Sequence, residues 1–173
     1  FRPGDNLFGT SLLALDVKTG KRVWHFQMVH HDIWNFDNPQ APVLMDVTID
    51  GRRTPIVVET TKQGFAYVFN RETGKPIWPI EERPVAASDL PGETLSPTQP
   101  FPTRPRPLEI QNLTEDVLID FTPELRKQAL EIVKHYTVGP LFNPPIQVGH
   151  PSGLRPLVSC PAGASHINGP TVA

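Results

Sequence analysis

The sequence has one cysteine, little net charge and no long apolar run. Cys160 alone excludes an intrachain disulfide and a cysteine-rich metal site. A formal net charge of −2 gives no electrostatic reason to expect nucleic acid or an anionic membrane as partner. No stretch approaches the roughly 20 apolar residues that cross a bilayer, and the N-terminus lacks a signal-peptide pattern. The chain of 173 residues is long enough for one ordinary domain.

Proline, by contrast, is abundant. It accounts for 21 of the 173 residues, about twice its usual share of about 5%. The chain also opens with Phe1 and closes in loop-like sequence. We therefore expect a piece of a longer protein.

Two segments of the chain repeat. ALDVKTGKRVW at 14–24 aligns without gaps on VFNRETGKPIW at 68–78, an offset of 54 residues. Each segment predicts a strand, a tight Thr-Gly turn and a second strand that ends in a packing anchor, Trp24 or Trp78. The offset suits one four-stranded blade of a β-propeller with a long connection.

Alternating apolar residues complete this blade. They predict strands at 43–49, 53–60, 64–70 and 75–79, with Asp50-Gly51 as a type I′ hairpin turn. The last two strands of the preceding blade fall at 11–17 and 22–28. In an up-and-down blade, the connection to the next blade and the turn between the second and third strands lie on one face. HHDIWNFD at 30–37 and Lys62 are therefore expected on the same face, near the central channel.

The sequence changes character after Trp78. PGETLSPTQPFPTRPRP at 91–107 has little strand or helix potential. Thr122 and Pro123 then form a helix start, and Gly139-Pro140 is the predicted stop. The apolar residues of this helix recur on one face: Leu125, Ala129, Ile132, Val133 and Tyr136.

We predict an all-β fold class, about two blades of a β-propeller with four-stranded antiparallel blades. Residues 1–79 hold the blades, a partial one at 1–29 and a fuller one at 43–79. Residues 80–140 form a Pro-rich and helical insertion that lies against the propeller. A further propeller segment begins within 141–173.

Several motifs resemble the pyrroloquinoline quinone (PQQ)-dependent dehydrogenases, in particular their glucose dehydrogenase-like branch. They are the two TG-K-x-x-W repeats, HHDIWNFDNPQAP, TTKQGFAYVFNRETGKPIWPIEERPV and SPTQPF. The resemblance covers about residues 1 to 140. It implies a fragment of an eight-bladed propeller that oxidises a sugar or alcohol with PQQ and a divalent cation, usually calcium. It also implies a periplasm-facing enzyme that passes electrons to quinone or cytochrome c.

The resemblance also assigns site residues. Lys62 matches the cation that contacts the quinone oxygens of the cofactor. The family pattern H-H-D-x-W-D has its catalytic base directly after tryptophan, and here that position is Asn35. An amide cannot accept a proton at neutral pH, although its carbonyl oxygen can serve a metal or a substrate hydroxyl. Asp32 and Asp37 are then the candidate replacement bases.

Other features of the motifs narrow the expectations. His30 and His31 are adjacent, so in extended chain they point to opposite faces, which favours packing or orienting the loop over shared metal ligation. Most cation ligands of the family would lie outside this chain, and AGASHINGP at 162–170 departs from the family's glycine-rich, tryptophan-containing segment. The isolated chain is expected to be inactive.

Two non-enzymatic alternatives stay open. One is a propeller scaffold built from the same tryptophan-anchored repeats, and the other is a family member that binds quinone or sugar without turnover. A scaffold has no reason to keep Lys62 beside an HHD-x-W connection, which favours the dehydrogenase. Asn35 is the reason to keep the second alternative.

Overall fold

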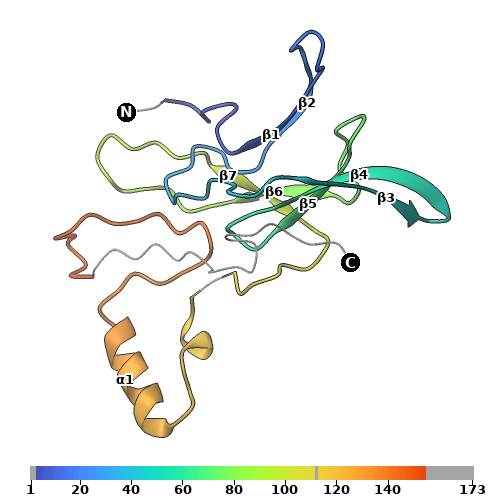
Figure 1. Cartoon of the computed structure of the whole chain (residues 1–173). Helices are drawn as coiled ribbons and strands as arrows, with labels where there is room; N and C mark the ends of the chain where they lie inside the picture. The colour runs from blue at the N-terminus through green and yellow to red at the C-terminus, as the bar shows by residue number, and fades with distance from the viewer. Residues whose placement is uncertain (1–2, 112, 155–173) are drawn as a thin grey trace.

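The computed structural model describes residues 3–111 and 113–154. In this part of the chain, three antiparallel sheets precede one 3-10 turn and one α-helix (Figure 1). The sheets pair β1 with β2, β3 with β4 and β5, and β6 with β7. Neither helical element is long and apolar enough to span a membrane. The strands are β1 Ser11–Leu15, β2 Arg22–Gln27, β3 Val43–Ile49, β4 Arg52–Thr60, β5 Ala66–Asn70, β6 Ile80–Pro84 and β7 Thr98–Pro102.

The two repeated segments form the same turn. Oδ1 of Asp16 accepts hydrogen bonds from the backbone N–H groups two and three residues later and from Oγ1 of Thr19. Oδ1 of Asn70 accepts the equivalent three bonds, the last from Oγ1 of Thr73. The glycine that closes each turn has φ of 68° or 69°, a region that only glycine enters without strain. The predicted repeat is therefore confirmed in its hydrogen bonds.

Trp24 joins the first repeat to the second. Its Nε1 donates to the carbonyl of Arg71 at 2.9 Å, and its ring packs on Phe69 with centroids 5.9 Å apart. A Cβ atom placed on Gly74 would lie only 2.6 Å from Cγ of the indole. Trp24 is thus the predicted packing anchor. Trp78 is half-buried and makes no hydrogen bond or ring contact with any described residue, so its anchoring role stays a prediction.

The central sheet follows the predicted hairpin. β3 pairs with β4 from Val43 opposite Val58 to Ile49 opposite Arg52. The turn residues Asp50 and Gly51 have φ of 50° and 75°, the two positive values that a type I′ turn requires. β5 then pairs along β4 in the expected order.

The predicted fourth strand at 75–79 is wrong. Only one bridge forms there, between Phe69 and Pro76, with Ile77 N–H donating to the carbonyl of Val68 at 2.9 Å. Pro76 and Pro79 carry no N–H, so the ladder cannot extend in either direction. The blade therefore has three strands and a single bridge.

The prediction that 91–107 lacks strand structure is also wrong, because β7 lies within it and pairs with β6. Backbone bonds from Val85 to the carbonyl of residue 97 and from Thr103 to that of residue 79 flank the ribbon. These two bonds show that the odd-numbered residues of β6 and β7 occupy the hydrogen-bonded positions of the antiparallel pair. Pro84, Pro100 and Pro102 all fall at the other positions, where a missing N–H costs no ladder bond.

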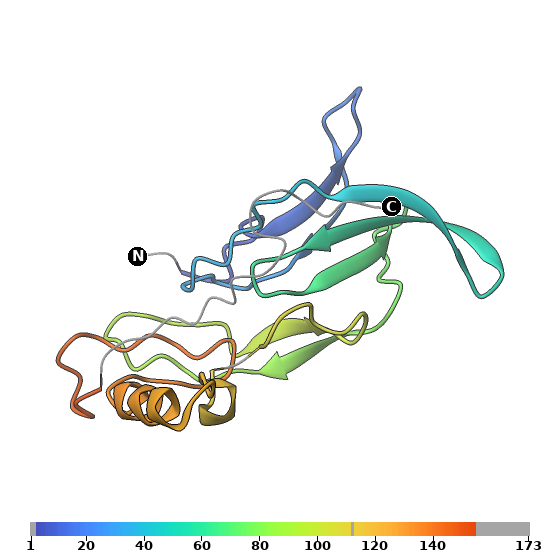
Figure 2. The ribbon, with the colours of Figure 1, turned by 60° about the horizontal axis from the view of Figure 1, so that its bottom comes forward.

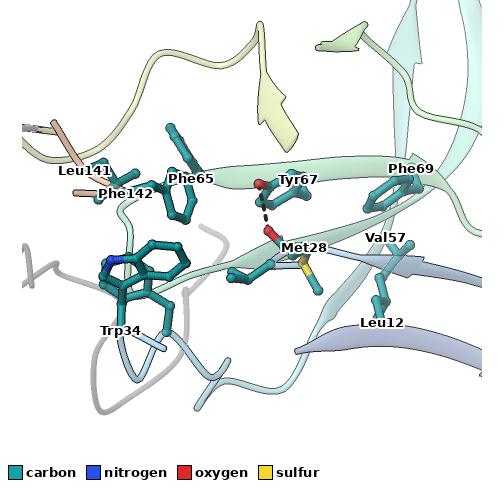
Figure 3. Packing of buried hydrophobic residues seen from close by; sticks show 11 residues of the cluster. Leu12, Met28, Trp34, Val57, Phe65, Tyr67, Phe69, Leu141 and Phe142 are labelled. Carbon is teal, nitrogen blue, oxygen red and sulfur yellow. Dashed lines mark hydrogen bonds between the residues drawn. The ribbon is translucent and has the colours of Figure 1, made fainter. Parts of the chain in front are cut away.

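A cluster of buried side chains lies between the first hairpin and the central sheet (Figure 3). Phe26 and Met28 meet the alternate residues Phe65, Tyr67 and Phe69. The hydroxyl of Tyr67 donates to the carbonyl of Pro100 at 2.7 Å, which attaches β7 to this cluster. Figure 2 shows the β6–β7 ribbon beside β5.

The helix α1 spans Pro123–Val133 and follows the 3-10 turn η1, Glu115–Val117. Thr122 is its N-cap, as predicted, and its Oγ1 accepts from Leu125 N at 3.2 Å. The helix ends at Val133, six residues before the predicted stop. Only Val133 is buried, and Ile132 is 61% exposed. Figure 1 shows α1 standing apart from the sheets of the described chain, so its packing against a propeller stays a prediction.

Candidate functional site

The site begins with the connection between β2 and β3. Asp32 holds it in shape, because its Oδ1 accepts from Trp34 N and its Oδ2 from Phe36 N, both at 2.8 Å. Trp34 and Phe36 point inward and are at most 2% exposed, whereas Asn35 and Asp37 are exposed. Asn35 has φ of 61°, a value that asparagine tolerates better than most residues. The connection thus offers Asn35 and Asp37 to a ligand and keeps Asp32 for its own backbone.

A distant segment fixes the inward face of this connection. The rings of Trp34 and Phe36 stack with centroids 6.0 Å apart, and the edge of Phe142 meets Trp34 at 5.2 Å. Nε1 of Trp34 donates to the carbonyl of Asn143 at 2.8 Å. Figure 3 shows Trp34 and Phe142 beside each other at one end of the core. Residues near 141, for which the sequence predicts no element, therefore support the site.

Lys62 reaches the connection from the turn between β4 and β5. Its Nζ donates to Oδ1 of Asp37 at 2.5 Å and to the backbone oxygen of Asn35 at 3.1 Å. The Lys62 side chain is 10% exposed and that of Asp37 is 59% exposed. Gly64, with φ of 73°, closes the turn through a bond to Thr61 O. The prediction that Lys62 and the connection share one face is confirmed.

Gln99 of β7 clamps the start of the connection. Its Oε1 accepts from His30 N at 2.8 Å and its Nε2 donates to His30 O at 2.7 Å, so one amide pairs with both polar atoms of one residue. The His30 ring lies between Oε1 of Gln27, at 2.9 Å, and Oε1 of Glu82, at 3.1 Å. Gln99 is fully buried. The expectation that His30 orients the loop fits these contacts.

His31 is 7% exposed, and its Nδ1 lies 2.5 Å from the carbonyl oxygen of Gly4. Because a carbonyl oxygen only accepts, Nδ1 carries the proton. The two histidines thus have separate partners. In the described part of the chain, no three His, Cys, Asp or Glu residues gather closely enough to hold a metal ion.

Glu59 is a buried carboxyl group that the sequence motifs do not point to. This glutamate of β4 is only 2% exposed, its Oε2 is buried without a hydrogen-bond partner in the described chain, and burial raises the pKa of its carboxyl to about 7. The sequence signal that could have found it is alternation along β4, because Val57 and Glu59 lie opposite Phe69 and Tyr67 of β5 on one face of the sheet.

The family model for the β-propeller domain of PQQ-type glucose, ethanol and alcohol dehydrogenases matches residues 1–171. The chain belongs to this family. The resemblance read from the motifs and the propeller fold class are thereby confirmed. Residues 155–173, which include Cys160 and AGASHINGP, lie outside the described residues.

Several curated relatives match a large part of this chain. The quinate/shikimate dehydrogenase (quinone) of Acinetobacter baylyi is 42% identical over 120 residues, 69% of this chain and 15% of that protein. The glycerol dehydrogenase large subunit of Gluconobacter oxydans is 40% identical over 123 residues, 70% of this chain and 17% of that protein. The quinoprotein glucose dehydrogenase of Escherichia coli is 38% identical over 99 residues, 57% of this chain and 12% of that protein. The chain therefore spans less than a fifth of each relative's length.

The family implies a resident PQQ and a cation, and the residues present fit the two groups differently. The ammonium of Lys62 has three N–H donors and two acceptors among the described residues, so one N–H remains for a quinone oxygen. A cation finds no ligand set among the same residues. Lys62 thus suits PQQ, whereas metal ligands would have to come from elsewhere.

Proposed function

We propose that this chain is part of a PQQ-dependent dehydrogenase that oxidises a CH–OH group of a sugar or alcohol. The observation that carries the proposal is the pair formed by Lys62 and Asp37, a cation and an exposed carboxylate 2.5 Å apart on one face. The names of the relatives support the substrate class, because they include glycerol and glucose dehydrogenases. The small share of each relative that is matched supports a longer parent protein.

Asp37 is the base in this proposal. It is exposed on the side of the connection that faces Lys62, whereas both oxygens of Asp32 accept backbone N–H groups. A general base needs a free lone pair within reach of the proton it takes. Asp37 therefore accepts the proton of the substrate hydroxyl at a carboxylate oxygen. Asp32 holds the loop, and Asn35 offers its amide oxygen to the hydroxyl or to a cation.

Lys62 supplies the fixed positive charge of the reaction. PQQ, when bound, serves as the two-electron acceptor of the oxidation. Lys62 would donate its remaining N–H to the quinone oxygens, on which negative charge develops, and its burial would make this stabilisation stronger than in water. Its bond to Asn35 O keeps the ammonium in place throughout.

Three further properties of the parent belong to the same proposal. Quinone or cytochrome c takes the electrons, which is supported by the word quinone in the name of the Acinetobacter baylyi relative. The cation is calcium. The enzyme faces the periplasm, in keeping with the family resemblance.

The test is dye-linked oxidation of sugars and alcohols by the full-length parent, reconstituted with PQQ and calcium. We expect Asp37→Asn to lower kcat by roughly a hundredfold or more, the usual contribution of a general base. Asp32→Asn, which keeps one acceptor oxygen, is the matched control and should lose much less. Equal losses in the two variants would contradict the assignment of Asp37.

Asn35 supports a second candidate, a propeller that binds quinone or sugar without turnover. The same assay separates the candidates through Asn35→Asp. Inactivity of the parent together with activity of this variant would favour the binding module. A strong parent activity that depends on Asp37 would favour the dehydrogenase.

A further inference from the structure

A cavity of about 870 Å³ lies beside the connection that carries Asn35 and Asp37. Its lining includes Gly4, His31, Ile33, Glu93, Thr94 and Gln147. We propose that this cavity is a substrate subsite that binds a neutral, hydroxyl-rich group, with Nε2 of His31 and the carboxylate of Glu93 as hydroxyl acceptors. The inference rests on the proposed function, whose reacting hydroxyl would lie at Asp37.

The cavity is close to the Lys62–Asp37 pair along the chain. Ile33 lines it, and Asn35 follows two residues later. Two residues of extended chain span at most about 7 Å. The carbonyl of Asn35 in turn accepts from Lys62 Nζ at 3.1 Å. In this proposal, one polyhydroxylated molecule extends from the cavity to the pair.

His31 presents a defined hydrogen-bond acceptor in this wall. Its Nδ1–H is committed to the carbonyl of Gly4, which leaves Nε2 as the ring nitrogen that can accept a hydrogen bond. No described residue hydrogen-bonds to Nε2. The ring is almost fully buried, so its orientation is set before a ligand arrives. Such an acceptor suits the O–H of a sugar or polyol.

Glu93 lies in a loop whose own contacts give it shape. Its Oε2 accepts from the hydroxyl of Ser88 at 2.5 Å, and its backbone N–H bonds Leu90 O at 3.1 Å. The ring of His150 lies 2.7 Å from Oδ2 of Asp89, which ties the loop to the segment that contains Gln147. Oε1 of Glu93 has no partner among the described residues. Glu93 lines the cavity, and its Oε1 is the second acceptor of the proposal.

These two groups favour neutral ligands over anionic ones. A carboxylate in place of a hydroxyl group would meet the negative charge of Glu93 and the lone pair of His31, with no cation in the lining to offset them. Like charges in a partly buried site repel more strongly than in water. We therefore expect the cavity to accept D-glucose and to reject D-glucuronate, in which a carboxylate replaces the C6 hydroxymethyl group.

The experiment is calorimetric titration of the full-length parent, free of PQQ, with D-glucose and D-glucuronate. In His31→Asn, the amide nitrogen can keep the bond to Gly4 O while Nε2 is lost, and asparagine tolerates the φ of 46° at this position. Losing one such hydrogen bond should weaken D-glucose binding by roughly tenfold. Glu93→Gln should narrow the difference in affinity between D-glucose and D-glucuronate. Val148→Ser, next to Gln147 and 88% exposed, is the control and should bind as the parent does.

Kinetics with PQQ and calcium separate this inference from the proposed function. If both hold, His31→Asn raises KM for D-glucose by roughly tenfold and changes kcat little. A parent that oxidises D-glucose, with binding and KM unchanged in both variants, would overturn the subsite and leave the dehydrogenase standing. No binding of D-glucose to the parent would also overturn it. Binding that weakens in His31→Asn, in a parent without turnover, would support the subsite and count against the enzyme.

Discussion

Nζ of Lys62 and Oδ1 of Asp37 lie 2.5 Å apart, although 25 residues separate them in the chain. The lysine is buried and the aspartate is exposed, so the ion pair faces solvent only through its carboxylate. An exposed ion pair contributes little to stability, and one with a buried partner is costly to break. The pair therefore links the shape of the β2–β3 connection to the position of the Lys62 ammonium group.

Lys62→Met is expected to lower kcat by roughly a hundredfold, because a fixed donor to developing negative charge is typically worth that much. Lys62→Arg keeps the charge but not the compact ammonium, so it should fall between Lys62→Met and the parent. The measurement is dye-linked oxidation by the parent with saturating PQQ. Lys75→Met, at an exposed lysine of the repeated turn, is the control and should keep full activity. A fully active Lys62→Met would remove Lys62 from the chemistry.

Gln99→Met is expected to destabilise the parent by about 1–3 kcal/mol, because it strips the hydrogen bonds from His30 N and O next to a fully buried side chain. Gln99→Glu keeps the acceptor for His30 N and loses the donor to His30 O. Chemical denaturation measures the loss. If Gln99 also positions the site, kcat should fall in Gln99→Met while KM for the substrate stays unchanged. Stability and kcat that both match the parent would show that the clamp is dispensable.

Glu59 should make stability depend on pH. Its pKa is about 7 in the folded protein against an ordinary value of 4.5 for a glutamate, so between these values the folded state keeps a proton that the unfolded state releases. The free energy of unfolding should therefore fall as the pH rises from about 4.5 to about 7, by about 1.4 kcal/mol per unit of pKa difference. Glu59→Gln should flatten this slope in thermal melts of the parent. Glu72→Gln, at an exposed carboxyl, should leave it as it is.

The two glycines of the repeated turn offer a matched pair of substitutions. Gly20→Ala and Gly74→Ala both place a Cβ at φ near 68°, which costs about 1–2 kcal/mol. A Cβ at Gly20 meets open space, whereas one at Gly74 lies 2.6 Å from the Trp24 ring. Gly74→Ala should therefore cost about 1–3 kcal/mol more than Gly20→Ala, as overpacking does. Equal costs in denaturation curves would mean that Trp24 moves aside freely.

The parts of the fold with local signals were predictable. The Asp/Asn-x-x-Thr-Gly repeat sets its own hydrogen bonds, and Asp50-Gly51 sets its own turn, so both follow from short-range chemistry. The meeting of Lys62 with the connection was predictable for another reason. Strand order alone decides which loops share a face, and that order needs no knowledge of side-chain contacts.

The rest depends on contacts between distant segments. β7 reads as coil because it is rich in proline, and its pairing becomes acceptable only when Pro84, Pro100 and Pro102 all avoid the hydrogen-bonded positions. The bonds from Gln99 to His30 join residues 69 positions apart. Asp32 and Asp37 look alike in sequence. Their roles differ in the structure because Asp32 accepts hydrogen bonds from the backbone N–H groups of Trp34 and Phe36.

The indole of Trp24 closes on the turn of the following repeat, through Arg71 O and the bare face of Gly74. The first repeat is thus anchored on the turn of the second. The contacts of Trp24 therefore join two repeats, and a chain cut just after Trp24 would keep the indole and lose its partners Phe69, Arg71 and Gly74. A shorter piece of this protein should therefore end after the Thr73-Gly74 turn, so that Trp24 keeps its contacts with Arg71 and Gly74.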